Sequence, residues 1–207
     1  MNYCAASLRD SGEEMNNDGL MIKGIHADKS SDYVIMVLSS DKKNGKLCDK
    51  IVRTAEKAVN KVDMNDMKKV FERLFMKFRG KGIFLKRKNP DITVLVLKGI
   101  NYYVMNRGDN KIMRVGRLGA EEIVPTLTEG QKGDYYYSEG RLPEGSTLIA
   151  ANSAFFERQM KTDIHKRLCP QMCVDGEAMQ NNIEYLRKLL WSRGEGRPVT
   201  AAAVCVR

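Results

Sequence analysis

The order of strand-like and helix-like segments is the feature that most limits how this 207-residue chain can fold. Helical periodicity occupies residues 47–58 and 64–78, and apolar runs of strand length dominate 92–115 and 135–152. One more helical pattern then precedes an apolar strand at 199–206. Because strands and helices do not alternate as repeated βα units, the order predicts an α+β fold with antiparallel sheets and segregated helices.

The two central helices and the last one are predicted from apolar residues spaced three and four apart. Asp63 is the expected N-cap of the second helix, Gly80 its end, and Asp175 the N-cap of the last. The expected inner faces are Leu47, Ile51, Ala55 and Ala58; Met64, Met67, Val70, Phe71, Leu74, Phe75 and Phe78; and Met179, Ile183, Leu186, Leu190 and Trp191.

Several strand pairings are also expected. Residues 2–8 and 19–25 flank a polar turn and predict a hairpin, and the apolar run 33–38 predicts a strand buried on both faces. The segments 92–98, 100–106 and 111–115 are separated by glycine-containing turns and predict a meander.

Composition narrows the class of protein. A hydrophobic content of 43% and a charged content of 29% are typical of one folded domain, here residues 1–207. The five cysteines are odd in number and dispersed, which favours free thiols, and no apolar segment is long enough to span a membrane. We therefore expect a cytoplasmic protein, and its net charge of +9 favours acidic partners.

Five short segments resemble those of one enzyme family and occur in the same order. Residues 102–111 form an apolar strand that ends in Asn-Arg-Gly-Asp-Asn-Lys, similar to the family's Asn-x-Gly-Asp-Ser-Arg. The other four are 13–18 (Glu-Glu-Met-Asn-Asn-Asp), 39–43 (Ser-Ser-Asp-Lys-Lys), 148–153 (Leu-Ile-Ala-Ala-Asn-Ser) and 198–200 (Pro-Val-Thr). The chain thus resembles a bacterial-type, single-domain metal-dependent serine/threonine protein phosphatase of the protein phosphatase 2C type. This resemblance implies a four-layer α-β-β-α sandwich of two antiparallel sheets flanked by helices.

The resemblance also implies where the catalytic site would lie, and most of its residues are replaced. In the family, aspartates hold two metal ions that activate a water molecule for attack on the phosphoryl group. Asp18 keeps its carboxylate, and Asp41 reaches the second metal position if one gap is allowed, which leaves at most two carboxylates. The replaced positions are Glu13 for the phosphate-binding arginine, Asn17 for a glutamate, and Ser39 or Ser40, Asn152 and Arg197 for aspartates.

Arg197 suggests how such a site could persist without metal. A guanidinium beside Asp18 would supply the positive charge that the metals supply in the family. We state a salt bridge between Arg197 and Asp18 as a hypothesis, with a solvated turn residue as the alternative.

Three functions are compatible with these residues. The first is a catalytically inactive binding or regulatory module that needs no cofactor and binds an acidic or phosphorylated protein, with nucleic acid and membrane not expected. The second is a divergent, active phosphatase that uses Mn²⁺ or Mg²⁺ at Asp18, Asp41 and Asp109. The third is a basic nucleic-acid-binding domain. A basic segment is the candidate partner surface: Lys77, Arg79, Lys81, Lys86, Arg87 and Lys88.

Overall fold

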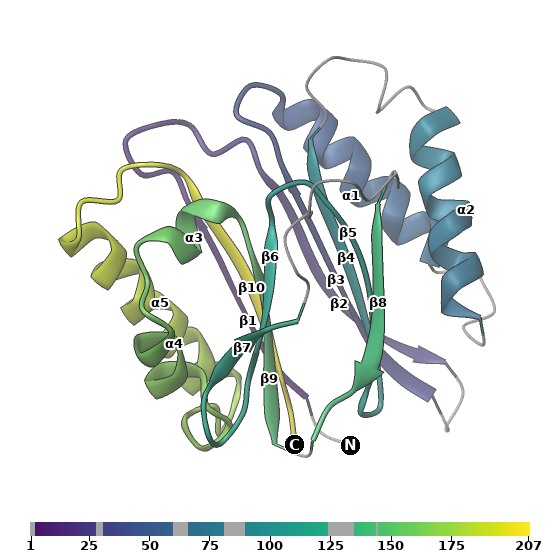
Figure 1. The fold of residues 1–207 in the computed structure, drawn as a ribbon. Coiled ribbons are helices and arrows are strands. Elements are labelled where there is room, and N and C mark those ends of the chain that lie inside the picture. The colour runs from purple at the N-terminus through teal and green to yellow at the C-terminus, as the bar shows by residue number, and fades with distance from the viewer. Residues whose placement is uncertain (1–2, 28–30, 60–65, 81–89, 124–134, 144) are drawn as a thin grey trace.

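Two antiparallel five-stranded sheets pack face to face in the computed structural model, which describes residues 3–27, 31–59, 66–80, 90–123, 135–143 and 145–207 (Figure 1). The first sheet has the order β1 (Tyr3–Asp10), β10 (Val199–Val206), β9 (Ser146–Ala151), β6 (Lys111–Val115) and β7 (Ala120–Glu122). The second has the order β2 (Gly19–Ala27), β3 (Ser31–Ser40), β4 (Asp91–Lys98), β5 (Asn101–Arg107) and β8 (Tyr136–Arg141).

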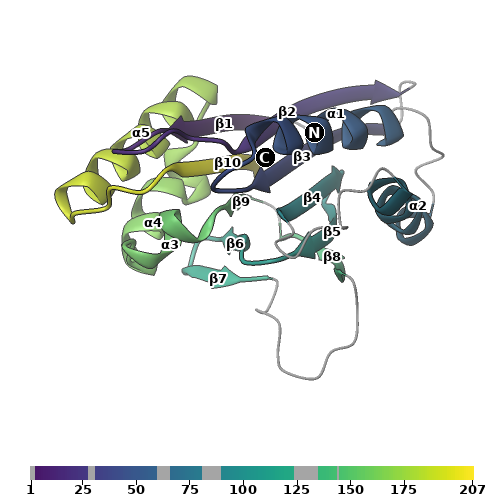
Figure 2. The ribbon, with the colours of Figure 1, turned by 90° about the horizontal axis from the view of Figure 1, so that it is seen from above.

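Helices cover the outer face of each sheet. The second sheet carries α1 (Gly45–Val59) and α2 (Met67–Gly80). The first carries α3 (Ser153–Glu157), α4 (Lys161–Leu168), the short 3-10 helix η1 (Pro170–Met172) and α5 (Gly176–Ser192). The view from above separates these layers (Figure 2). The α-β-β-α sandwich predicted from the sequence is therefore confirmed.

The core consists of three apolar layers, because both faces of each sheet are covered. In β3, Val34 and Met36 belong to the layer between the sheets, and Ile35 and Val37 belong to the layer under α1 and α2. Residues 33–38 are all buried, as the unbroken apolar run predicted. The layer between the sheets also contains Leu148 of β9 and Val204 of β10.

The predicted N-terminal hairpin is wrong. β1 pairs with β10, and β2 pairs with β3, so the polar loop at residues 11–18 crosses from one sheet to the other. The predicted meander is right for β4 and β5 but wrong for β6, which pairs with β9 in the opposite sheet. Turn residues between two apolar runs mark a reversal of the chain, but they do not say whether the second strand joins the same sheet.

The helix boundaries partly follow the sequence. Asp175 caps α5 by accepting a hydrogen bond from the Ala178 N–H at 2.7 Å, as predicted. The Lys69 N–H donates to Asp66 Oδ1 at 3.1 Å at the start of α2, and Asp63 lies outside the described residues. Trp191 was expected on the inner face of α5, but it is 48% exposed and donates its Nε1–H to Asp10 Oδ2 at 2.9 Å. The sequence reading missed α3 and α4.

Two further expectations concern cysteines and membranes. All five cysteines carry free thiols, as their dispersed positions predicted. In the parts of the chain that the structure describes, no helix combines the length and the apolar character needed to cross a bilayer.

Candidate functional site

Asp18 lies in the loop that leads from β1 in one sheet to β2 in the other, and is only 6% exposed. Asn16 fixes its position by connecting three segments. The Asn16 Nδ2 group donates to the Asp10 carbonyl at 2.9 Å and to Thr200 Oγ1 at 2.9 Å, and its Oδ1 accepts from the Asp18 N–H at 2.9 Å. The end of β1, the start of β10 and the start of β2 are thereby held together around the Asp18 carboxylate.

Asn152 places its amide directly against this carboxylate. Its Nδ2 group donates to Asp18 Oδ2 at 3.0 Å and to the Pro198 carbonyl at 3.0 Å. Its Oδ1 accepts from the Phe155 N–H at 3.3 Å, because Asn152 is the N-cap of α3. The Nδ2 end of the Asn152 amide faces two acceptors, and its Oδ1 end faces one donor. Exchanging Nδ2 and Oδ1 would therefore leave all three partners unsatisfied.

Burial raises the pKa of Asp18, because the charged form loses its hydration. Hydrogen bonds from Thr200, Asn152, Ser40 and the backbone of Asp41 oppose this shift by stabilising the carboxylate. The buried Asp18 carboxylate is therefore satisfied by neutral donors.

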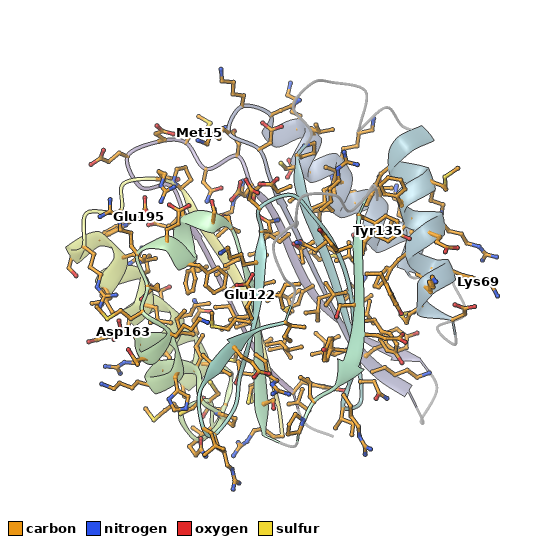
Figure 3. The ribbon with its side chains drawn as sticks, viewed as in Figure 1. Met15, Lys69, Glu122, Tyr135, Asp163 and Glu195 are labelled. Atoms are coloured by element: carbon orange, nitrogen blue, oxygen red, sulfur yellow. The ribbon has the colours of Figure 1, made fainter. Side chains whose placement is uncertain are left out.

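Arg197 lies in the chain segment next to this acid, but its side chain pairs elsewhere. Its Nη2 group donates to Glu195 Oε2 at 2.6 Å and to Glu157 Oε2 at 2.7 Å, and its Nε–H donates to Glu195 Oε1 at 2.8 Å. Glu195, labelled in Figure 3, is only 5% exposed, and the hydrogen bonds from Arg197 lower its pKa. The hypothesis of a salt bridge between Arg197 and Asp18 is therefore wrong. The bonds to Asp18 come from neutral groups.

The end of β3 provides the other side of the site. The Ser40 hydroxyl donates to Asn110 Oδ1 at 3.1 Å, while Ser39 is fully buried against the Cys48 thiol of α1. Ser40 is the serine that acts on Asp18, because it is among the groups that stabilise the Asp18 carboxylate. Asp41 is half-buried, and its Oδ1 accepts from the Lys43 N–H at 2.8 Å, which closes the turn that leads into α1.

The sequence reading did not single out Asp91, which lies opposite Ser40 in the pairing of β3 with β4. The pKa of Asp91 is raised to about 6, chiefly by burial and also by the charges of Asp109, Asp18 and Asp41, against a hydrogen bond from the Asp109 backbone. Gly108 allows the Asp91 side chain to approach the backbone of this turn. Its φ is +88°, and a Cβ at Gly108 would lie 1.9 Å from Asp91 Oδ1. The Asn-Pro-Asp segment looks like an ordinary turn before a strand, so only the register could have identified this acid.

The remaining predicted residues lie at the rim or away from the site. The Glu13 N–H donates to the Gly196 carbonyl at 2.9 Å, and Asn17 Nδ2 donates to the Lys42 carbonyl at 3.0 Å. Both side chains sit where loops meet rather than against Asp18. Lys77 is exposed on α2. The side chain of Arg79, together with Lys81, Lys86, Arg87 and Lys88, lies outside the described residues.

These donors do not fit a two-metal centre of the kind that the resemblance implies. The Asn152 Nδ2 group presents N–H bonds to Asp18 and has no lone pair to offer a cation. Hard divalent cations need several oxygen ligands, and Asp41 Oδ1 already accepts a hydrogen bond from the Lys43 N–H. Within the described ranges, no three His, Cys, Asp or Glu side chains are grouped so that they could hold a metal ion.

Comparison with known proteins gives a match at the level of structure alone. No protein-family model matches the chain, and no curated protein sequence does. The S. agalactiae serine/threonine phosphatase superposes with a TM-score of 0.77 at 14% identity, over 100% of both chains. The Mycobacterium tuberculosis serine/threonine phosphatase PstP/Ppp gives 0.70 at 10% identity, over 100% of this chain and 98% of that one.

This chain has the protein phosphatase 2C-like fold. The resemblance noted in the sequence is thereby confirmed at the level of the fold. Two further neighbours were solved with metals: RsbX in complex with magnesium (TM-score 0.65, 15% identity, covering 99% of this chain and 94% of that one) and the PstP catalytic domain with two manganese ions (TM-score 0.67, 10% identity, covering 100% and 98%).

Proposed function

We propose that this protein phosphatase 2C-like chain is a catalytically inactive relative of the phosphatases, a pseudophosphatase that serves as a binding or regulatory module. The contact between Asn152 Nδ2 and Asp18 Oδ2 at 3.0 Å carries the proposal. An aspartate at position 152 would place two carboxylates and the Pro198 carbonyl around one point, which a bound cation or protonation of one carboxylate would have to stabilise. The amide satisfies the same acceptors without a cation.

Arg197 and Ser40 support the same conclusion. At the positions where the family carries aspartates, Arg197 is engaged by Glu195 and Glu157, and Ser40 donates to Asn110. Three replaced positions each have a hydrogen-bonding partner that suits the new residue. The site is therefore adapted to its replacements, and we expect the fold to serve binding. The partner we expect is an acidic or phosphorylated protein, because the chain carries a net charge of +9.

A direct assay tests the inactivity. Purified protein is incubated with p-nitrophenyl phosphate and with a phosphoserine peptide. The buffer contains about 2 mM Mn²⁺ or Mg²⁺, which would saturate a site of micromolar affinity. We expect release of phosphate no faster than in the buffer. Metal-dependent turnover that disappears in the Asp18→Ala variant would overturn the proposal.

A divergent active phosphatase is the second candidate, and one observation favours it. Besides burial, the charges of Asp109, Asp18 and Asp41 contribute to the raised pKa of Asp91, so several acids lie near this site. These acids would attract divalent cations. The same assay separates the two candidates, because the second requires turnover that depends on Mn²⁺ or Mg²⁺.

A further inference from the structure

One side of α1 carries a continuous row of cations. Lys46, Lys50, Arg53 and Lys57 follow each other at spacings of four, three and four residues, so they share one stripe along the helix, which we call the α1 basic face. All four side chains are exposed. The opposite side of α1 is buried in the core through Cys48, Ile51, Ala55 and Ala58.

The side chains of the α1 basic face leave an open, shallow depression between them. This depression of about 310 Å³ is lined by the four cations together with Asp49 and Thr54. Asp49 is the one acid among these lining residues. The next acid along the helix, Glu56, is paired with Lys23 of β2 at 2.9 Å and does not neutralise the row.

Within the described chain, Lys46, Arg53 and Lys57 have no recorded ion pair, whereas some of the basic residues beside α3, α5 and β7 do. Arg114, Arg193 and Arg197, for example, are each bonded to a carboxylate. The charges of Lys46, Arg53 and Lys57, aligned on one face of α1, are thus left for a partner.

The α1 basic face begins at the rim of the Asp18 site. The Asn17 Nδ2 group, next to Asp18, donates to the Lys42 carbonyl at 3.0 Å, and a Cβ on Gly45 would lie 3.0 Å from Asn17 Oδ1. The first turn of α1 therefore lies against the loop that carries Asp18. A chain segment bound along α1 would reach the place where the phosphatases of this fold act.

We propose that the α1 basic face is the docking surface for an acidic, phosphorylated segment of a partner protein. The eleven helical steps from Lys46 to Lys57 span roughly 16 Å of helix, which an extended segment of about five residues matches. Carboxylates or phosphates spaced along such a segment would pair with Lys46, Arg53 and Lys57. This inference rests on the proposed binding role of the chain.

The test compares two triple variants of equal charge. The first reverses the face with Lys46→Glu, Arg53→Glu and Lys57→Glu, leaving Lys50 in place. The second is a matched control on the other layer, with Arg117→Glu, Lys166→Glu and Lys188→Glu, all exposed. Each variant changes the net charge from +9 by six, to +3. Circular dichroism confirms that both remain folded.

The probe is a fluorescein-labelled peptide of ten residues, rich in Asp and Glu with a central phosphoserine, measured by fluorescence anisotropy at low salt. Exposed ion pairs contribute little each, so we expect micromolar binding by the unaltered chain that weakens with salt. The α1 variant is expected to bind at least about 10-fold more weakly, and the control less than about 3-fold more weakly.

Three results would overturn the inference. They are equal losses in both variants, no binding of the peptide by the unaltered chain, or preferential binding of a DNA or RNA oligonucleotide at the α1 basic face. Each is separable from failure of the proposed inactivity, because turnover of p-nitrophenyl phosphate is measured without any docking segment.

Discussion

At the scale of single residues, Asn152 distinguishes this site from one built for metals. Its amide donates to both Asp18 and the Pro198 carbonyl, so a carboxylate in its place would meet two oxygen acceptors at about hydrogen-bond distance. Two buried carboxylates without a cation repel each other, and the ionised form of each is disfavoured. The chemistry of the site therefore depends on whether residue 152 presents a nitrogen or an oxygen to Asp18.

The Asn152→Asp substitution tests this directly. In EDTA at pH 7 we expect the free energy of unfolding to fall by about 2–3 kcal/mol, because an uncompensated charge is buried. If oxygen ligands alone recreate a cation site, Mn²⁺ should recover part of the loss. Urea unfolding with EDTA and with Mn²⁺ provides the measurement.

Asn182→Asp is the matched control for that experiment. Asn182 of α5 is also buried, at 8% exposure, and its Nδ2 group donates to the Met172 carbonyl of η1 at 2.8 Å. Its replacement should destabilise the chain without any response to Mn²⁺. An Asn152→Asp variant as stable in EDTA as the unaltered chain would contradict the account of the site given above.

Asp91 predicts a dependence on pH. Its pKa is raised to about 6, so the folded state binds its proton more tightly than the unfolded state does. The associated stability is present at low pH and is lost as the pH rises through about 6, where the folded state must carry a buried charge. Asp91→Asn should therefore stabilise the chain by about 1 kcal/mol at pH 7.5 and by nothing measurable near pH 4. Denaturant titrations in EDTA at both pH values check this, and a gain that is equal at both would count against it.

At the scale of elements, Arg197 holds the start of β10 to α3. It bridges Glu195, in the turn after α5, and Glu157, at the end of α3. The two acids differ in burial, since the Glu195 side chain is 3% exposed and the Glu157 side chain 51%. The pair with Glu195 is therefore the one whose loss should matter.

Arg197→Met is expected to lower the free energy of unfolding by about 2–4 kcal/mol, because it leaves the Glu195 charge buried without its partner. Glu157→Gln removes only an exposed pair and should cost less than about 1 kcal/mol. Thermal unfolding at pH 7 compares the two.

Since Arg197 lowers the pKa of Glu195, the contribution of this pair to stability is full at neutral pH and is lost as the pH falls through the acidic range. Similar losses in both variants would show that burial does not set the strength of these pairs.

The element order and its outcome show how much the sequence could predict. Periodicity predicted α1, α2, α5 and most strands, because periodicity is a local pattern of the sequence. The five ordered segments that resemble the phosphatases then predicted the sandwich. Pairing between sheets is not local: β1 and β2 look like a hairpin, yet they lie in different sheets. Asn152 and Asp18 were placed together only by the resemblance, whereas Asp91 carries no local signal that separates it from a turn residue.

At the scale of the whole molecule, the path of the chain links the two sheets. β1 lies in one sheet, β2 to β5 lie in the other, β6 and β7 return to the first, β8 crosses again, and β9 and β10 return. The apolar layer between the sheets draws residues from both, among them Val34, Leu95, Leu148 and Val204. Neither sheet could bury its inner face without the other.

We therefore predict that the outer layers unfold together in one cooperative transition. The single tryptophan, Trp191, reports the α5 layer through its fluorescence, and hydrogen exchange of α1 peptides, followed by mass spectrometry, reports the opposite layer. With increasing urea, the two probes should give the same midpoint and the same slope, because the shared core couples the layers. A midpoint for α1 that is lower by 1 M or more (roughly 1–3 kcal/mol in urea) would mean that α1 and α2 open as a separate unit. In that case the α1 basic face would move independently of the Asp18 site, although the two touch through Asn17 and Lys42.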